Sequence, residues 1–74
     1  MTVDWRRPFS RNINRVGHDP DTGEMFVEWR DGRISIYDGV SPEKFDLIHK
    51  APSVTQAINM EIKPSHTHRY LPRH

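Results

Sequence analysis

Residues 24–37 constrain the fold of this 74-residue chain more than any other segment. Apolar side chains occupy every second position from Met25 to Trp29, a pattern typical of a half-buried β-strand. Asp31 and Gly32 follow, and an Asp-Gly pair favours a two-residue hairpin turn because both central positions of such a turn need positive φ. The segment therefore predicts a β-hairpin.

The length of the turn predicts which residues of the two strands pair. With a two-residue loop, Val27 lies opposite Ile36 on the core face of the hairpin, and Phe26 lies opposite Tyr37 on the other face. The sequence thus predicts an aromatic pair on the outer face. Such a pair can stack on nucleic-acid bases or simply stabilise the hairpin.

The hairpin is flanked by one predicted strand and two predicted helices. Ile13 and Val16 interrupt the alternation in residues 12–18, which predicts a strand with a bulge or a bend inside it. Residues 41–51 begin with Ser-Pro-Glu, and residues 53–63 begin with the capping-box spacing Ser-x-x-Gln. We therefore predict an α+β fold, in which a three-stranded antiparallel sheet is followed by two short helices packed on one face.

Size and composition exclude several classes of protein. A chain of 74 residues forms one small domain, which buries only about 60–65% of its unfolded surface. The chain has no cysteine, so it has neither a disulfide framework nor a thiolate site. No apolar run approaches the roughly 18 residues of a membrane span, and the first residues do not resemble a signal peptide. We expect a cytoplasmic, monomeric protein without a membrane partner.

Charge is sorted along the chain. Residues 1–15 hold four arginines and one aspartate, and residues 63–74 hold three bases and no acid, so each segment has a net charge of +3. Residues 16–62 hold four bases and nine acids, a net charge of −5. An acidic module between two basic segments is typical of a protein that docks on a partner.

The residues of these elements resemble the KTSC domain family at nearly constant spacing over roughly residues 10–63. The matching positions are Ser10, Asn12, Ile13, Val16, Gly17, Asp19, Val27, Trp29, Gly32, Tyr37, Gly39, Val40, Phe45, Leu47, Ala51, Pro52, Ser53, Asn59, Ile62 and Lys63. The chain departs at His18 and Ser35, where the family commonly has tyrosine.

The extent of the resemblance divides the chain into three parts. We expect a flexible basic arm at residues 1–10, a KTSC-like βββαα domain at residues 11–64, and a flexible His/Arg tail at residues 65–74.

The resemblance implies a non-enzymatic role. Within the family the chain resembles a small phage transcription regulator. That likeness implies binding to the large subunits of bacterial RNA polymerase in the host cytoplasm, inhibition of initiation and readthrough of terminators. KTSC domains also occur at the C-terminus of some lysyl-tRNA synthetases. These relatives imply the alternative, an accessory domain that binds tRNA or another structured RNA.

The basic arm carries the predicted partner contacts. Arginine and aromatic side chains dominate the hot spots of protein interfaces, and the arm combines the two. The predicted partner-binding residues are Val3, Trp5, Arg6, Arg7, Phe9 and Arg11. Trp5 has a second interpretation, since it can instead fold back over an apolar patch of the domain.

The RNA-binding alternative has its own candidate residues, and catalysis has none. RNA would stack on Phe26 and Tyr37 and contact Lys63 and Arg69 through its phosphates. No nucleophile stands beside a credible base, and no glycine-rich phosphate loop is present. The histidines of the tail lack a rigid frame, so no metal site and no cofactor are predicted.

Overall fold

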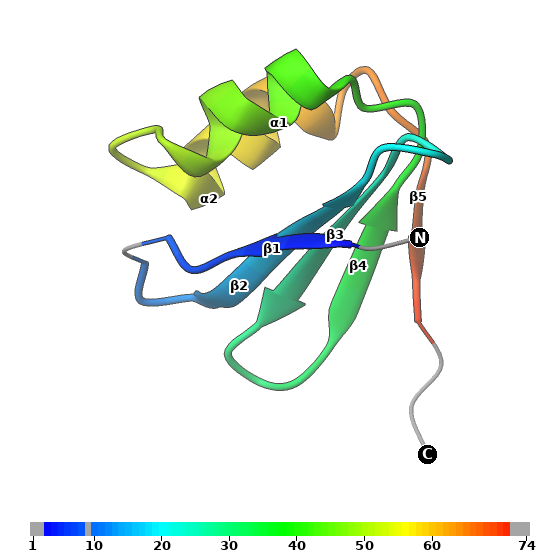
Figure 1. The fold of residues 1–74 in the computed structure, drawn as a ribbon. Coiled ribbons are helices and arrows are strands. Elements are labelled where there is room, and N and C mark those ends of the chain that lie inside the picture. Colours follow the sequence, from blue (N-terminus) through cyan, green and yellow to red (C-terminus); the bar gives the residue numbers. More distant parts are fainter. Residues whose placement is uncertain (1–2, 9, 72–74) are drawn as a thin grey trace.

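The protein folds into one antiparallel sheet with its helices on a single face (Figure 1). The computed structural model describes residues 3–8 and 10–71. The five strands lie in the order β1-β2-β3-β4-β5. They are β1 (Asp4–Arg6), β2 (Ile13–Asp19), β3 (Glu24–Trp29), β4 (Ile34–Tyr37) and β5 (His68–Tyr70).

Three helical segments connect β4 to β5. They are α1 (Pro42–His49), α2 (Val54–Ala57) and the π-helical turn η1 (Ile58–Ile62), which continues α2 directly. The predicted N-caps are confirmed, since the Ser41 and Ser53 hydroxyls accept hydrogen bonds from backbone N–H groups three residues later, at 3.1 and 3.4 Å. Within the described residues, no helix is long and apolar enough to cross a membrane.

The α+β class and the three central strands agree with the prediction, but the predicted number of strands is wrong. β1 and β5 add one strand to each edge of the sheet, and both lie in segments that we expected to be flexible. Each has three residues, all of them exposed, so neither shows the alternation that marks a strand in sequence. They form because β2 and β4 would otherwise leave their edge N–H and C=O groups unpaired.

The predicted hairpin exists, but its loop has three residues instead of two. The backbone N–H of Trp29 donates to the Arg33 carbonyl at 2.8 Å, and that of Gly32 donates to the Trp29 carbonyl at 3.0 Å. Gly32 has a φ of 95°, which places it at the left-handed position of a turn followed by a bulge. Each residue of β3 therefore pairs with the residue of β4 that lies one position before its predicted partner.

This shift moves the side chains of β4 to the opposite faces of the sheet. Tyr37 lies opposite Met25, and Phe26 lies opposite Ile36. The predicted Phe26–Tyr37 pair is wrong, because Tyr37 is fully buried on the helix side and only Phe26 faces outward. The bulge predicted in the first strand is confirmed, since the pairing of β2 with β3 shifts between Ile13 and Arg15.

The core lies between the sheet and the helices. Buried His18 identifies the helix-facing side, because its ring stacks on Phe45 of α1 at 5.2 Å and its Nε2 donates to the Val40 carbonyl at 2.7 Å. The largest cluster of buried apolar residues comprises Ile13, Val16, Met25, Val27, Tyr37, Val40, Phe45, Ile48, Val54, Ile58 and Ile62. Val54 of α2 and Ile58 and Ile62 of η1 are among them.

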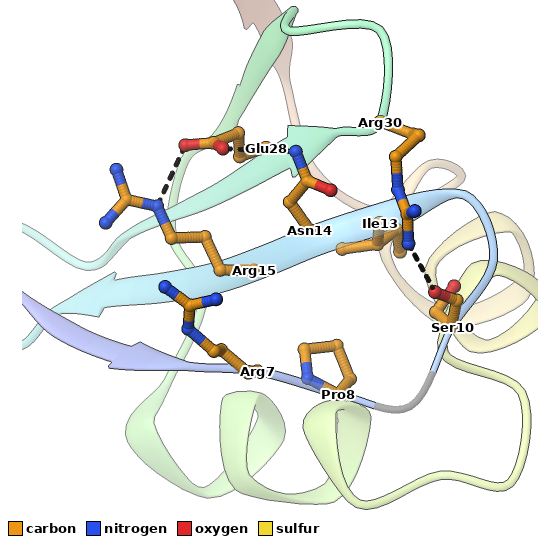
Figure 2. A pocket seen from close by; sticks show the side chains of 8 residues that line it. All are labelled: Arg7, Pro8, Ser10, Ile13, Asn14, Arg15, Glu28 and Arg30. Carbon is orange, nitrogen blue, oxygen red and sulfur yellow. Dashed lines mark hydrogen bonds and ion pairs between the residues drawn. The ribbon is translucent and has the colours of Figure 1, made fainter.

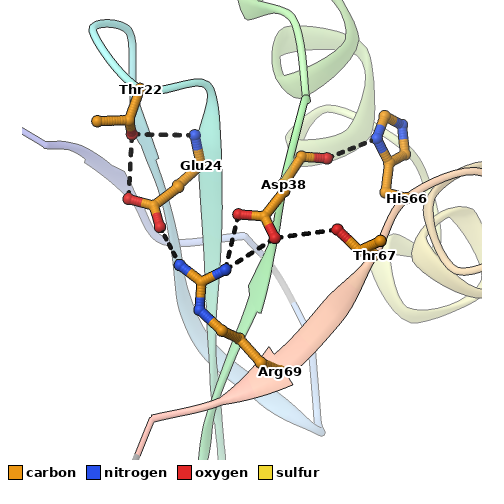
Figure 3. Close-up of polar contacts among 6 residues, drawn as sticks. All are labelled: Thr22, Glu24, Asp38, His66, Thr67 and Arg69. Carbon is orange, nitrogen blue, oxygen red and sulfur yellow. Dashed lines mark hydrogen bonds and ion pairs between the residues drawn. The ribbon is translucent and has the colours of Figure 1, made fainter.

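Polar contacts hold β5 against β4 (Figure 3). The Arg69 guanidinium binds the Asp38 carboxylate at 2.7 and 2.8 Å and also the carboxylate of Glu24. The Thr67 hydroxyl donates to Asp38 at 3.0 Å. Nδ1 of His66 lies 2.8 Å from the Asp38 carbonyl, and its Nε2 lies 2.9 Å from Nζ of Lys44. Since the Lys44 ammonium can only donate, Nδ1 carries the proton and donates to the carbonyl.

We predict that Tyr37→Phe does not destabilise the protein. The Tyr37 hydroxyl is buried and has no hydrogen-bond partner among the described residues. Removing it should leave the free energy of unfolding unchanged or raise it by up to about 1 kcal/mol, as measured by urea denaturation.

Ser35→Ala is the control for this substitution. The buried Ser35 hydroxyl accepts a hydrogen bond of 2.7 Å from the Trp29 indole, so its loss should cost about 1 kcal/mol. A Tyr37→Phe variant as unstable as Ser35→Ala would show that the tyrosine hydroxyl makes a stabilising bond.

We also predict that Arg69→Gln flattens the dependence of stability on acid pH. Hydrogen bonding from Arg69 holds the pKa of Asp38 below its ordinary value of 3.8. A carboxylate with a lowered folded-state pKa stabilises the fold above its unfolded pKa, and this contribution is lost as the pH falls through the folded-state pKa. Urea denaturation from about pH 6 to pH 2 should show lower stability near neutrality and a shallower loss on acidification.

Lys63→Gln removes the same charge from an exposed position outside this cluster and should keep the original pH profile. Parallel profiles for Arg69→Gln and the unmodified chain would contradict the role assigned to the Asp38–Arg69 contact.

Candidate binding face

Charges of opposite sign occupy the two ends of the sheet. One end, here called the arginine end, contains the start of β2 and the loop between β3 and β4. A hydrogen bond of 2.7 Å from the Arg30 N–H to the Asn12 carbonyl joins these two segments. The charged residues of this end are Arg7, Arg11, Arg15, Arg30, Arg33, Glu28 and Asp31. At the acidic end, the Val40 N–H donates to the Gly23 carbonyl at 2.8 Å and joins the β2–β3 turn to the end of β4. Its charged residues are Asp4, Asp19, Asp21, Glu24, Asp38 and Arg69. The ends carry net charges of +3 and −4, respectively.

Trp5 covers the sheet on the face that points away from the helices, here called the outer face. It lies opposite Gly17, whose neighbour His18 points toward α1. A Cβ at Gly17 would lie 2.8 Å from the Trp5 ring, so only glycine allows the indole to lie this close. The ring centroid of Trp5 is 6.0 Å from that of Phe26. Trp5 therefore packs on the sheet, as its second interpretation proposed, while 36% of its surface stays exposed.

Arg15 joins Trp5 to the charged part of the face. The carbon of its guanidinium lies 3.9 Å from the centroid of the Trp5 ring, a cation–π contact. Its Nε donates to Glu28 at 2.8 Å across the β2–β3 pair. Asn14 donates to the same carboxylate at 3.3 Å. The hydrogen bond from Arg15 is the main cause that lowers the pKa of Glu28.

A pocket of about 530 Å³ opens beside this group (Figure 2). Its lining residues are Arg7, Pro8, Ser10, Ile13, Asn14, Arg15, Glu28 and Arg30. Figure 2 shows the Arg7 side chain extending from beyond the end of β1 toward Arg15. Arg30 donates to the Ser10 carbonyl at 3.3 Å. The pocket thus holds three guanidinium groups and one carboxylate, and its chemistry suits an anion.

The structure separates the predicted partner-binding residues. Val3 and Trp5 both approach Gly17 on the outer face, and Arg7 lines the pocket. Arg6 follows Trp5 in β1, so its side chain points to the opposite face of the sheet, where its Nε donates to the Asp4 carboxylate at 2.9 Å. Arg11 is exposed. The predicted contact at Phe9 lies outside the described residues.

Of the residues that line the pocket, sequence reasoning predicted Arg7 and missed the other seven: Pro8, Ser10, Ile13, Asn14, Arg15, Glu28 and Arg30. The alternation of β3 places Glu28 on its outer face, but no sequence signal pairs it with Arg15. That pair depends on the bulge at the start of β2, which sets the register of the two strands.

The four predicted nucleic-acid-binding residues do not share one surface. Phe26 lies on the outer face beside Trp5, whereas Tyr37 is buried against the helices. Lys63 follows η1, and Arg69 is engaged with two carboxylates of the acidic end. In the part of the chain that the structure describes, no three His, Asp or Glu side chains are placed to hold a metal ion.

Comparisons with known proteins agree on the family. The family model of the KTSC domain matches residues 9–66. An uncharacterized protein of Stutzerimonas stutzeri (strain A1501) is 31% identical over 61 residues, which cover 82% of this chain and 84% of the relative.

A solved structure shows the same fold. The crystal structure of a KTSC domain protein from Yersinia pestis superposes with a TM-score of 0.84 at 22% sequence identity, covering 96% of this chain and all of the other. With the family model matching most of its length, the chain belongs to the KTSC domain family.

Proposed function

We propose that this KTSC domain is a non-enzymatic interaction protein that docks on bacterial RNA polymerase in the cytoplasm. Contact with the large subunits would inhibit initiation and promote terminator readthrough. The observation that carries the docking role is the charge separation along the sheet, with Arg7 and Arg11 exposed at one end, and Asp21 exposed and Asp38 half-buried at the other. Such a bipolar surface orients a protein partner that has complementary charges.

The distribution of charge favours a protein over RNA as the partner. A nucleic-acid backbone is uniformly negative, so it would be attracted to the arginine end and repelled by the carboxylates of the acidic end. The predicted stacking pair is absent, because Tyr37 is buried in the core. Tryptophan and arginine, by contrast, are enriched among the residues that dominate protein interfaces, and Trp5 and Arg15 lie in contact here.

The pocket itself gives no support to catalysis. Ser10 is the only hydroxyl residue among those that line it, and no histidine lines it. The Ser10 Oγ accepts a hydrogen bond from the Asn12 N–H at 3.3 Å, and among the described residues no base is hydrogen-bonded to it that could activate it as a nucleophile. The identity of the partner comes from the resemblance to a small phage regulator of transcription.

The test is binding to purified bacterial core RNA polymerase at about 150 mM salt, where weak surface attraction is already screened. The unmodified chain should co-elute with the enzyme in gel filtration. The double variant Arg7→Glu/Arg11→Glu should bind at least about 10-fold more weakly, because it reverses two exposed charges of the arginine end.

The matched control is Lys50→Glu/Lys63→Glu, which makes the same change of charge at exposed positions beyond the C-terminal ends of α1 and η1. It should bind like the unmodified chain. Equal binding by both double variants would contradict docking through the arginine end. Salt-sensitive binding to tRNA without a polymerase complex would replace this function with the RNA-binding alternative.

A further inference from the structure

We infer that the pocket at the arginine end binds a side-chain carboxylate from an acidic segment of the protein partner. The inference rests on the proposed function in one respect, namely that the partner is a protein. It adds the chemical group that this partner presents and the residues that hold it, namely Arg7, Arg15 and Arg30, which all line the pocket.

The pocket has more hydrogen-bond donors than acceptors. Each guanidinium carries five N–H donors. Arg15 uses its Nε on Glu28, and Arg30 uses one nitrogen on the Ser10 carbonyl. Arg7 makes no hydrogen bond or ion pair with any described residue, yet it lies close enough to Glu28 to help lower the pKa of that carboxyl. With one carboxylate against three guanidinium groups, the pocket can accept a second anion.

Arg15 is held in place before any ligand arrives. Glu28 fixes its Nε, and the Trp5 ring lies 3.9 Å from the carbon of its guanidinium. A planar guanidinium held at two places loses little side-chain entropy when it binds a carboxylate. Trp5 thus acts as a platform for Arg15, and its indole lies close enough to report on binding.

The lining favours a carboxylate over a phosphate. Glu28 remains in the pocket, and it repels a phosphate dianion more strongly than it repels a singly charged carboxylate. Pro8 and Ile13 add apolar surface to the lining, against which the methylene groups of a glutamate can pack.

The experiment titrates the full chain with a blocked tetraglutamate peptide at low salt and follows the ¹H–¹⁵N signals of arginine Nε–H and tryptophan Nε1–H. The signals of Arg7, Arg15 and Trp5 should move together and saturate. Tetraglutamine should move none of them, and inorganic phosphate should bind more weakly than the acidic peptide. Arg7→Gln should weaken peptide binding by about five-fold or more, whereas Lys50→Gln should not.

A pair of matched acidic variants separates a built pocket from general surface charge. Glu28→Gln removes the carboxylate that competes within the pocket, so peptide binding should become about three-fold or more tighter. Glu24→Gln removes the same charge from the same strand, but its side chain binds Arg69 at the acidic end, so peptide affinity should stay nearly unchanged. Equal tightening by both variants would show that only net charge matters and would overturn the inference.

The polymerase assay distinguishes the two proposals. A chain that binds polymerase but gives no saturable shifts at Arg7 and Arg15 with the peptide overturns the carboxylate pocket and leaves docking in place. If the variants bind the peptide with the expected order of affinities but the chain forms no polymerase complex, the pocket is supported and the proposed partner is overturned. Tighter binding of phosphate than of the acidic peptide also overturns the inference.

Discussion

The three-residue loop between β3 and β4 decides how both faces of the sheet are used. It pairs Met25 with Tyr37 and Phe26 with Ile36, so the tyrosine fills the core while the isoleucine joins Phe26 outside. A two-residue loop would reverse these assignments, because neighbouring residues of a strand point to opposite faces. Because of the longer loop, the outer face presents apolar surface that needs a cover.

That need explains why the first residues of the chain become a strand. Trp5 packs beside Phe26, and it can do so because Gly17 has no side chain beneath it. The Trp5 ring then makes a cation–π contact with the Arg15 guanidinium. Arg7, two positions after Trp5 in the chain, lines the pocket. The proposed binding site is thus a consequence of how the outer face is covered. The helices take no part in it, since the lining residues lie between positions 7 and 30.

The two ends of the sheet use their charges differently. At the acidic end, Asp38 and Glu24 are engaged with Arg69 and help to hold β5 on the sheet. At the arginine end, Arg7 has no hydrogen-bond or ion-pair partner among the described residues, and its charge is open to a ligand. Exposed ion pairs contribute little to stability, whereas unpaired charges grouped on one face act on approaching partners. The arginine end is therefore better suited to binding, and the acidic end serves both structure and orientation.

The sequence by itself determined the elements whose signals are local. The Ser41 and Ser53 caps and the alternation around Val27 depend on near neighbours, and both were predicted correctly. Only the tertiary structure decided the edge strands, the hairpin register and the pocket. Three exposed residues such as Asp4–Arg6 carry no periodic signal and become a strand only when β2 offers an edge. Arg15 and Glu28 are 13 positions apart in sequence, and the register of two strands, set by a bulge and a loop, brings them together.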